Sequence, residues 1–288
     1  MIILENEQLR VQIHRRGAEL QSLLLKSNGL EYLWQADPAF WAKHSPLLFP
    51  IVGTLKNDTY YYRGQAYHMA RHGFAREKDF SVEGSNDREA VFVLKDDDLT
   101  RKLYPFAFLL KLHYRLLDSN LYLRYQVQNP AKESLYFSIG GHPAFNVPLL
   151  PHTVYNDYYL EFNRAEKADR WTLENGLLKP EPEPFLDSSS HLALNRELFG
   201  NDAIVLKGLQ SSIVSLRCHK STHGLNFGIE GWPALGIWAA PGAPFVCIEP
   251  WCGHTDFVNH NQELSQKAGI IRLGPGGNWK KEWWVNLY

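Results

Sequence analysis

A glutamate at the end of a short apolar run is the first residue of this chain that could carry chemistry. Glu249 follows the run from Phe245 to Ile248 and precedes Pro250. In a strand it would share one face with Phe245 and Cys247, at the point where the proline stops regular pairing. Burial there would raise the pKa of the carboxyl group and make it a stronger base. The alternative is a structural glutamate that accepts backbone hydrogen bonds or pairs with an arginine.

Two histidines lie beside glycine. His142 follows Gly140 and Gly141 and precedes a proline, and His72 precedes Gly73. Glycine lets a ligand or another backbone approach closely, and a histidine titrates near neutral pH, so it can give or take a proton. The alternative, and the commoner case for a single histidine, is a side chain hydrogen-bonded into a turn.

Five further polar residues could assist these three. Arg71 and Arg76 surround the first histidine and could hold a sugar or an anion, or they could be solvated surface charges. Asn57, Lys56 and Asp202 are further candidates for contacts with a ligand.

Several kinds of chemistry lack their motifs in this sequence. There is no HxH or HExxH pattern and no clustered carboxylate, so we expect no metal site and no cofactor. The absence of GxSxG argues against a serine hydrolase, and the absence of GxGxxG argues against a dinucleotide-binding fold. Acid–base chemistry by histidine and glutamate remains.

Strands are the elements that must position these groups. Apolar and polar residues alternate over 108–116 and 121–127, and a turn at 118–120 joins the two runs, which predicts an antiparallel hairpin with one solvated face. Further short strands are expected at 9–13, 20–25, 30–34, 60–63, 65–67, 91–94, 135–139, 158–162, 171–173, 204–206, 213–218, 225–229, 245–248, 269–273 and 279–285. A helical turn is expected after Asp37, a short helix or turn at 98–104, and a short helix at 192–199.

Many short strands, frequent glycine and proline turns and few helices predict an all-β fold, a large antiparallel β-sandwich. The 288 residues show no repeat or linker, so a single domain over 1–288 is expected. The 9 Trp, 14 Tyr and 15 Phe support strands, and they also suit a site that stacks rings against a sugar.

Composition restricts the partners and the compartment. The net charge of -1 gives no electrostatic reason to expect nucleic acid or an anionic membrane as a partner. Three cysteines without a CxxC motif fit a reducing compartment. We see no signal peptide and no apolar run of membrane-spanning length, so we expect a cytoplasmic protein.

Four segments occur together in one order: Phe49-Pro-Ile-Val-Gly-x-Leu-Lys-Asn57, Arg71-His-Gly-Phe-Ala-Arg76, Gly140-Gly-His-Pro-Ala-Phe145, and Gly236-Ile-Trp through Glu249-Pro-Trp-Cys-Gly253. With these four segments in this order, the chain resembles the aldose 1-epimerase (mutarotase) family. Within that family it is most similar to the LacX-like branch, close to the hexose-6-phosphate 1-epimerases. The resemblance spans nearly the whole chain. It implies a large antiparallel β-sandwich of the galactose mutarotase type, with the sugar in an open cleft across one sheet.

The resemblance also implies roles for single residues in the interconversion of α and β anomers through the open-chain aldehyde. Glu249 matches the general base that takes the proton of the C1 hydroxyl, and His142 matches the general acid that protonates the ring oxygen. His72 and Asp202 match residues that bind the sugar. Arg76 matches an arginine that contacts the sugar phosphate in the phosphate-using relatives.

One position departs from the family pattern. Thr54 stands where relatives often carry an arginine. If that arginine binds phosphate, its absence argues against a tight site for hexose 6-phosphates, although Lys56 and Arg71 could compensate. We therefore expect a mutarotase that acts on a hexose. The alternatives are a hexose-6-phosphate 1-epimerase and a non-catalytic carbohydrate-binding or regulatory protein of the same fold.

Overall fold

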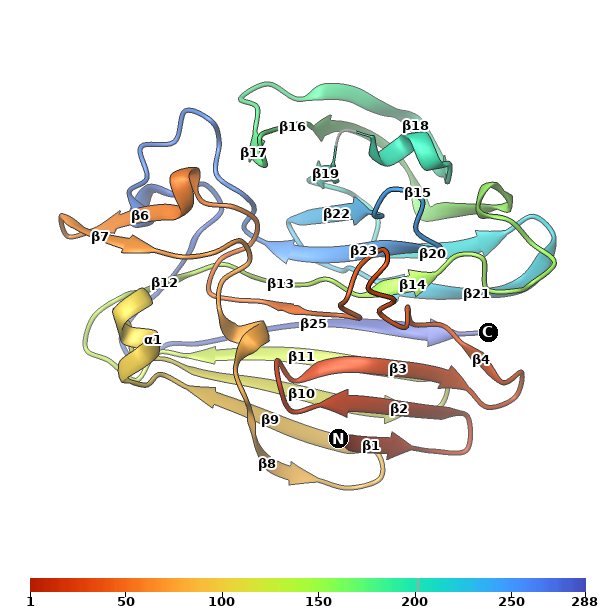
Figure 1. Ribbon diagram of the computed structural model, residues 1–288, viewed down its shortest axis with the longest axis horizontal. Coiled ribbons are helices and arrows are strands. Elements are labelled where there is room, and N and C mark those ends of the chain that lie inside the picture. The colour runs from red at the N-terminus through yellow and green to blue at the C-terminus, as the bar shows by residue number, and fades with distance from the viewer. Residues whose placement is uncertain (201) are drawn as a thin grey trace.

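One large antiparallel sheet extends through the molecule in the computed structural model, which describes residues 1–200 and 202–288 (Figure 1). Its main strands, in spatial order, are β5 (Leu47–Leu48), β13 (Ile139–Gly141), β23 (Phe245–Cys252), β22 (Ala234–Trp238), β19 (Ile204–Lys207), β15 (Tyr158–Trp171), β20 (Ile213–Cys218), β21 (Ser221–Gly228), β25 (Asn278–Leu287), β11 (Asn120–Gln128), β10 (Leu109–Leu117), β9 (Glu89–Lys95) and β8 (Ser81–Ser85). Two more strands pair beside this path, β14 (Ala144–Asn146) with β23 and β18 (Glu183–Ala193) with β15.

The remaining elements are smaller. A second sheet contains β1 (Ile2–Glu5), β2 (Leu9–His14), β3 (Glu19–Leu25) and β4 (Leu30–Glu31). Three two-stranded ribbons pair β6 (Thr59–Tyr62) with β7 (Gln65–His68), β12 (Leu135–Phe137) with β24 (Ile271–Leu273), and β16 (Leu173–Glu174) with β17 (Leu177–Leu178). The helices are α1 (Asp98–Leu103), η1 (Lys56–Asp58), η2 (Ala75–Glu77), η3 (Tyr155–Asp157), η4 (Arg196–Phe199) and η5 (Leu264–Gln266).

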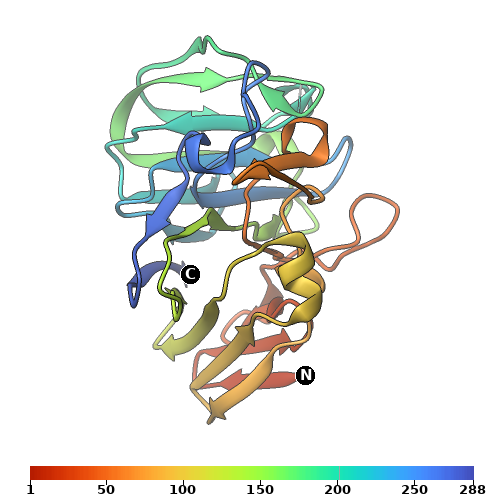
Figure 2. The same cartoon turned by 90° about the vertical axis from the view of Figure 1, so that its left-hand side faces the viewer.

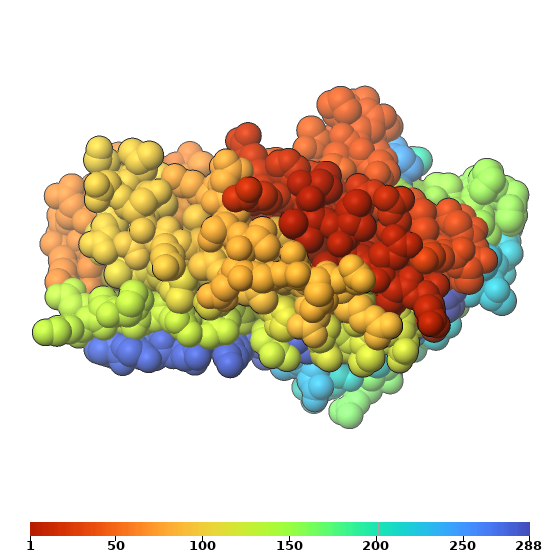
Figure 3. All heavy atoms as spheres, turned by 90° about the horizontal axis from the view of Figure 1, so that it is seen from below, coloured from red at the N-terminus to blue at the C-terminus, as the bar shows by residue number. Residues whose placement is uncertain are grey.

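The four-stranded sheet packs across the part of the large sheet formed by β9, β10 and β11 (Figures 1 and 2). The Tyr114 hydroxyl crosses between the layers and donates to the Ala18 carbonyl oxygen at 2.8 Å. Seen from below, the red N-terminal strands lie directly against the orange and yellow strands of the other layer (Figure 3). The prediction of an all-β antiparallel sandwich is confirmed. Among the described residues, no helix is long and apolar enough to cross a membrane.

The hairpin of β10 and β11 supplies much of the core between the layers. Its register pairs Leu109 with Gln128 and Leu117 with Asn120, as the alternation of apolar residues predicts. Every second side chain of both strands is buried. The sequence prediction for this hairpin is confirmed because the same-face neighbours of a strand lie two residues apart.

Replacing a buried leucine and an exposed leucine with alanine, in two separate variants, tests this packing. Leu110 of β10 is 0% exposed and Leu99 of α1 is 62% exposed. We expect Leu110→Ala to lower the free energy of unfolding by about 2–5 kcal/mol, because it leaves a cavity in the core. Leu99→Ala, the matched control, should change it by less than about 0.5 kcal/mol. Urea unfolding measures both values, and equal effects would contradict this description of the core.

Two predicted elements are wrong in detail. Residues 192–199 do not form one helix, because β18 continues to Ala193 and only η4, Arg196–Phe199, is helical. Leu192 pairs with Leu160 in the sheet, and this tertiary pairing outweighs the local helical preference. The strands expected at 158–162 and 171–173 are mostly one long strand, β15, whose pairing with β18 is interrupted by register shifts.

Candidate active site

A cavity of about 180 Å³ opens over the strands β13, β23, β22 and β19. Acidic, basic and aromatic side chains meet in its wall. The lining residues are Trp41, Gly53, Arg71, His72, Arg76, His142, Leu173, Asp202, Ala203, Val205, Trp238, Glu249, Trp251 and Thr255. Six of the residues singled out from the sequence lie in this wall, although they come from widely separated segments of the chain: Arg71, His72, Arg76, His142, Asp202 and Glu249.

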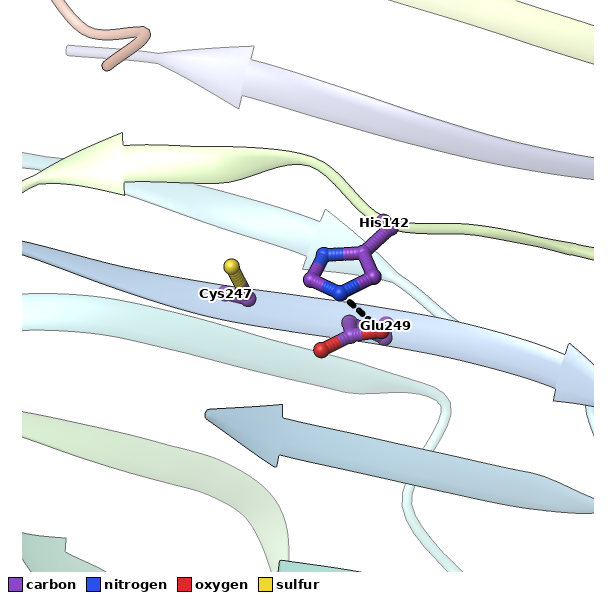
Figure 4. Close-up of side chains that lie close together, drawn as sticks. All are labelled: His142, Cys247 and Glu249. Carbon is purple, nitrogen blue, oxygen red and sulfur yellow. Dashed lines mark ion pairs between the residues drawn. The ribbon is translucent and has the colours of Figure 1, made fainter. Parts of the chain in front are cut away.

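The register of the sheet places His142 opposite Glu249. On one side of them Gly140 pairs with Trp251, and on the other Ala144 pairs with Cys247. The same register holds on both sides of the break between β13 and β14, so the histidine and the glutamate are cross-strand neighbours. Cross-strand neighbours share a face. His142 Nε2 accordingly lies 3.3 Å from Glu249 Oε2 (Figure 4).

Pro250 does not end the strand, which corrects the sequence prediction. β23 continues to Cys252, and Pro250 pairs with Leu235 of β22. By the register of β13 and β23 the proline lies opposite Gly141, where the pairing of these two strands has already ended at Gly140, so its missing N–H removes no hydrogen bond from that ladder. The same break in pairing lets the histidine ring reach the glutamate.

The histidine and the glutamate form a buried pair, and burial favours the uncharged form of each group. The Glu249 side chain is 1% exposed, and burial raises the pKa of its carboxyl group well above 4.5, against the opposing effect of the Arg71 charge. Burial also lowers the pKa of His142 to about 3, and Arg71 adds to this shift. The predicted desolvation of Glu249 is confirmed. Neither Glu249 Oε2 nor His142 Nδ1 has a hydrogen-bond partner within the described chain.

His72 is held in a fixed orientation at the cavity. Its Nδ1 accepts a hydrogen bond from the Gly53 N–H at 3.1 Å, and its own backbone N–H donates to the Gly53 carbonyl at 2.8 Å. The backbone of His72 is left-handed, with φ 69°, a conformation that a tightly constrained histidine can adopt. Because Nδ1 is an acceptor, the neutral ring carries its proton on Nε2. That N–H can donate to a ligand.

Two tryptophans complete the wall around His142, and sequence reasoning did not single them out. The Trp41 ring stacks on the His142 ring with centroids 4.8 Å apart, and Trp238 meets it edge-on at 5.7 Å. Trp41 follows a turn that begins at Asp37, where the backbone N–H groups of Phe40 and Trp41 donate to the Asp37 carbonyl. The high tryptophan content was the available signal, but it gave no positions.

The charged residues Arg71, Arg76 and Asp202 form one cluster in the cavity wall, whereas the candidates Asn57 and Lys56 lie outside it. Arg71 Nη2 lies 3.7 Å from Asp202 Oδ1, and Arg76 donates from Nη2 to the Arg71 carbonyl at 2.8 Å. The prediction for Asn57 is not supported. Its left-handed backbone, φ 56°, lies in the tight turn η1, and its side chain is exposed outside the cavity.

Lys56 and Thr54 also lie outside the cavity wall. Lys56 donates from Nζ to the His260 carbonyl at 3.3 Å. Thr54 contacts Thr255 through its backbone, and the Thr255 hydroxyl in turn donates to the Gly176 carbonyl between β16 and β17. This contact holds the β16–β17 ribbon, which contributes Leu173 to the wall.

The structure is that of an antiparallel β-sandwich protein with a buried histidine–glutamate pair in a cavity walled by aromatic and basic side chains. The aldose 1-epimerase family matches residues 1–285, and the chain belongs to that family. It is 36% identical to the plasmid-encoded protein LacX of Lactococcus lactis subsp. lactis, with 99% of each chain covered. The predicted resemblance to the LacX-like branch is confirmed.

Solved structures agree with this assignment. A galactose mutarotase related enzyme from Lactobacillus acidophilus is 35% identical and superposes with a TM-score of 0.95, with 100% of this chain and 97% of the other covered. A galactose mutarotase-like protein from Lactobacillus casei is 31% identical and superposes with the same TM-score of 0.95 over 100% of both chains. The fold is therefore of the galactose mutarotase type, as predicted.

Proposed function

We propose that the protein is an aldose 1-epimerase that interconverts the α and β anomers of a hexose by opening and closing the sugar ring. One observation carries the proposal. His142 and Glu249 lie 3.3 Å apart, buried, at directly opposed positions in the cavity wall. A single sugar can contact both groups there, which ring opening requires.

Ring opening moves two protons. The base, Glu249 in this proposal, takes the proton of the C1 hydroxyl, while the acid, His142, delivers a proton to the ring oxygen as the C1–O5 bond breaks. Rotation in the open-chain aldehyde exposes the other carbonyl face, and the reverse transfers close the ring. Because the two transfers are coupled, no strong charge accumulates on the sugar.

The pair supplies the one mobile proton that this reaction needs. In the sugar-free cavity, burial favours the neutral arrangement, with the proton on Glu249 and an uncharged imidazole ring. The reactive arrangement, a carboxylate beside an imidazolium, contains the same number of protons. Hydrogen bonds from sugar hydroxyls to the carboxylate, added to the charge of Arg71, would favour that second arrangement.

The remaining residues would bind and orient the sugar. His72 is positioned to donate from Nε2, and the Asp202 carboxylate can accept from hydroxyl groups. Trp41 and Trp238 offer apolar ring faces to the C–H groups of a sugar. Arg71 and Arg76 would donate to hydroxyl or phosphate oxygens.

Polarimetry tests the proposal. Optical rotation is followed after dissolving α-glucose, α-galactose or α-glucose 6-phosphate, with and without the protein. We expect mutarotation to accelerate for at least one of the three. If none accelerates, the non-catalytic carbohydrate-binding alternative replaces the enzyme.

A hexose-6-phosphate substrate is the second candidate, and the charge of the cavity favours it. Two arginines, Arg71 and Arg76, line the wall together with the Asp202 carboxylate, and burial raises the pKa of the second acidic group there, Glu249. Arg76 Nε is buried without a hydrogen-bond partner in the described chain. A phosphate group would supply acceptors for such a donor.

Arg76→Ala separates the two substrates. If a phosphate binds there, we expect KM for glucose 6-phosphate to rise roughly tenfold or more, since a charge-assisted hydrogen bond is lost, while KM for glucose changes little. Arg101→Ala is the control, because Arg101 pairs with Asp96 on the surface outside the cavity. A proportional rise in KM for both sugars would argue that Arg76 serves the cavity in general.

A cytoplasmic location remains part of the proposal. It is supported by the three cysteines of the chain, Cys218, Cys247 and Cys252, which are all free thiols.

A further inference from the structure

A buried cysteine lies beside the histidine–glutamate pair. Ligand atoms of His142, Cys247 and Glu249 all lie within 4.8 Å of one another, and all three residues are buried (Figure 4). Cys247 precedes Glu249 by two residues on β23, so their side chains share a face. The cysteine is the diagonal neighbour of His142, which comes from the adjacent chain segment.

The distances suit one small metal ion. Three atoms within 4.8 Å of one another have a common point no more than about 2.8 Å from each, whereas zinc binds nitrogen, oxygen and sulfur at about 2.0–2.3 Å. The separation of 3.3 Å between His142 Nε2 and Glu249 Oε2 is about the edge of a tetrahedron with bonds of that length. Small side-chain rotations would therefore close the site.

The ligand types and their charges also fit zinc. Imidazole, thiolate and carboxylate are the three groups that proteins use for Zn²⁺. When the ion binds, the thiol releases its proton to solvent, and a carboxyl proton leaves as well where one is present. The product combines Zn²⁺ with two anionic ligands and a neutral imidazole, so the ion and its three ligands together carry no net charge.

Two of the three ligands face the cavity, and Cys247 lies behind them. Glu249 Oε2 has no hydrogen-bond partner in the described chain, although its side chain is 1% exposed. His142 and Glu249 both line the cavity, which can hold the ion and a water molecule as its fourth ligand.

We propose that His142, Cys247 and Glu249 form a three-ligand zinc site, and that a zinc ion bound there inhibits the protein by occupying the atoms that exchange protons with the sugar. The inhibition rests on the proposed epimerase function, whereas the binding does not. Zinc and sugar should therefore compete for the cavity.

Metal binding is measured first, because it needs no activity. Zn²⁺ is titrated against the metal-free protein in competition with a chromophoric chelator, and Co²⁺ is used as a spectroscopic substitute. We expect one tight zinc ion per chain and a thiolate-to-cobalt charge-transfer band. A protein that binds no zinc at micromolar concentration, or a cobalt complex without this band, overturns the site.

Cys247→Ser identifies the sulfur ligand, and Cys218→Ser is the matched control, since both cysteines are buried and only Cys247 lies in the cluster. Cys247→Ser should weaken zinc binding by at least about tenfold, because even the loss of an outer-shell partner costs roughly 10–100-fold. Cys218→Ser should bind zinc like the wild type. Equal zinc affinity of Cys247→Ser and wild type overturns the proposal and points to surface histidines.

Inhibition is measured last, as a ratio of rates with and without zinc for each variant, so that a change in the metal-free rate does not matter. The wild type should lose its mutarotation rate when one zinc ion is bound, and Cys247→Ser should need at least about tenfold more zinc. Zinc that binds through Cys247 but leaves the rate unchanged overturns the inhibitory role alone. A protein without any mutarotase activity that still binds zinc refutes the proposed function and leaves the zinc site standing.

Discussion

Glu249→Gln is expected to lower the mutarotation rate by roughly 10²–10⁴-fold, the range that a positioned general base or acid contributes. Glutamine keeps the shape of the side chain and its place opposite His142, but it cannot take the proton of the C1 hydroxyl. Polarimetry at saturating sugar measures the loss. KM should change much less than kcat, because the amide oxygen still accepts a hydrogen bond.

The matched control is another buried glutamate. Glu166 is 2% exposed and accepts hydrogen bonds from the backbone N–H groups of Gln210 and Ser211, outside the cavity. Glu166→Gln should keep the wild-type rate and lose stability, since those bonds are no longer charge-assisted. Near-normal turnover by Glu249→Gln would refute the assignment of Glu249 as the base.

Glu249→Gln should also make the fold more stable than that of the wild type as the pH rises. The pKa of Glu249 is raised by burial, so between the unfolded value of 4.5 and the raised folded value the native state holds a proton that the unfolded chain has released. The stability of the wild type falls with pH across that window, and the stability of Glu249→Gln does not. The melting temperature of the variant should exceed that of the wild type at pH 8 and match it near pH 4. Each kcal/mol corresponds to roughly 2–4 °C for a chain of this size.

Local patterns in the sequence were enough to predict the strands of the core and the desolvation of Glu249. Alternation along 108–127 determines which side chains of that hairpin face inward, and this depends only on neighbours in the chain. The apolar run before Glu249 likewise indicates burial whatever strand lies beside it. Where local and tertiary preferences conflict, as at residues 192–199, the prediction was wrong.

The assembly of the site could not be predicted in this way. His142 faces Glu249 because two segments about a hundred residues apart pair in one particular register, and residue types do not specify such a register. Cys247 was recognised as a buried strand residue, but its place beside His142 follows from the same pairing. The family resemblance named the pair, and the register explains why the two groups meet. Their catalytic roles stay predictions until the variants are measured.

His142→Asn is expected to reduce the rate by a similar factor, roughly 10²–10⁴-fold, since asparagine cannot deliver a proton to the ring oxygen. Asparagine removes the ring on which Trp41 stacks, so the sugar should also bind more weakly. His113→Asn is the control, because His113 lies on the surface beside Glu89 and outside the cavity. If His142→Asn turns over at close to the wild-type rate, another group protonates the ring oxygen.

For His142→Asn, the gain in stability over the wild type should appear as the pH falls, the opposite of the dependence expected for Glu249→Gln. The folded pKa of His142 is about 3 and its unfolded value is 6.5, so between these values the unfolded chain binds a proton that the native state does not. The wild type therefore loses stability as the pH falls through that window, whereas His142→Asn is spared the loss. Relative to the wild type, Glu249→Gln should be more stable on the alkaline side of neutrality, and His142→Asn should be more stable on the acid side. Melting temperatures of both variants from pH 4 to pH 8 test whether burial favours the uncharged forms of His142 and Glu249, without any assay of activity. If both variants were more stable than the wild type on the same side of neutrality, this description of the pair would be wrong.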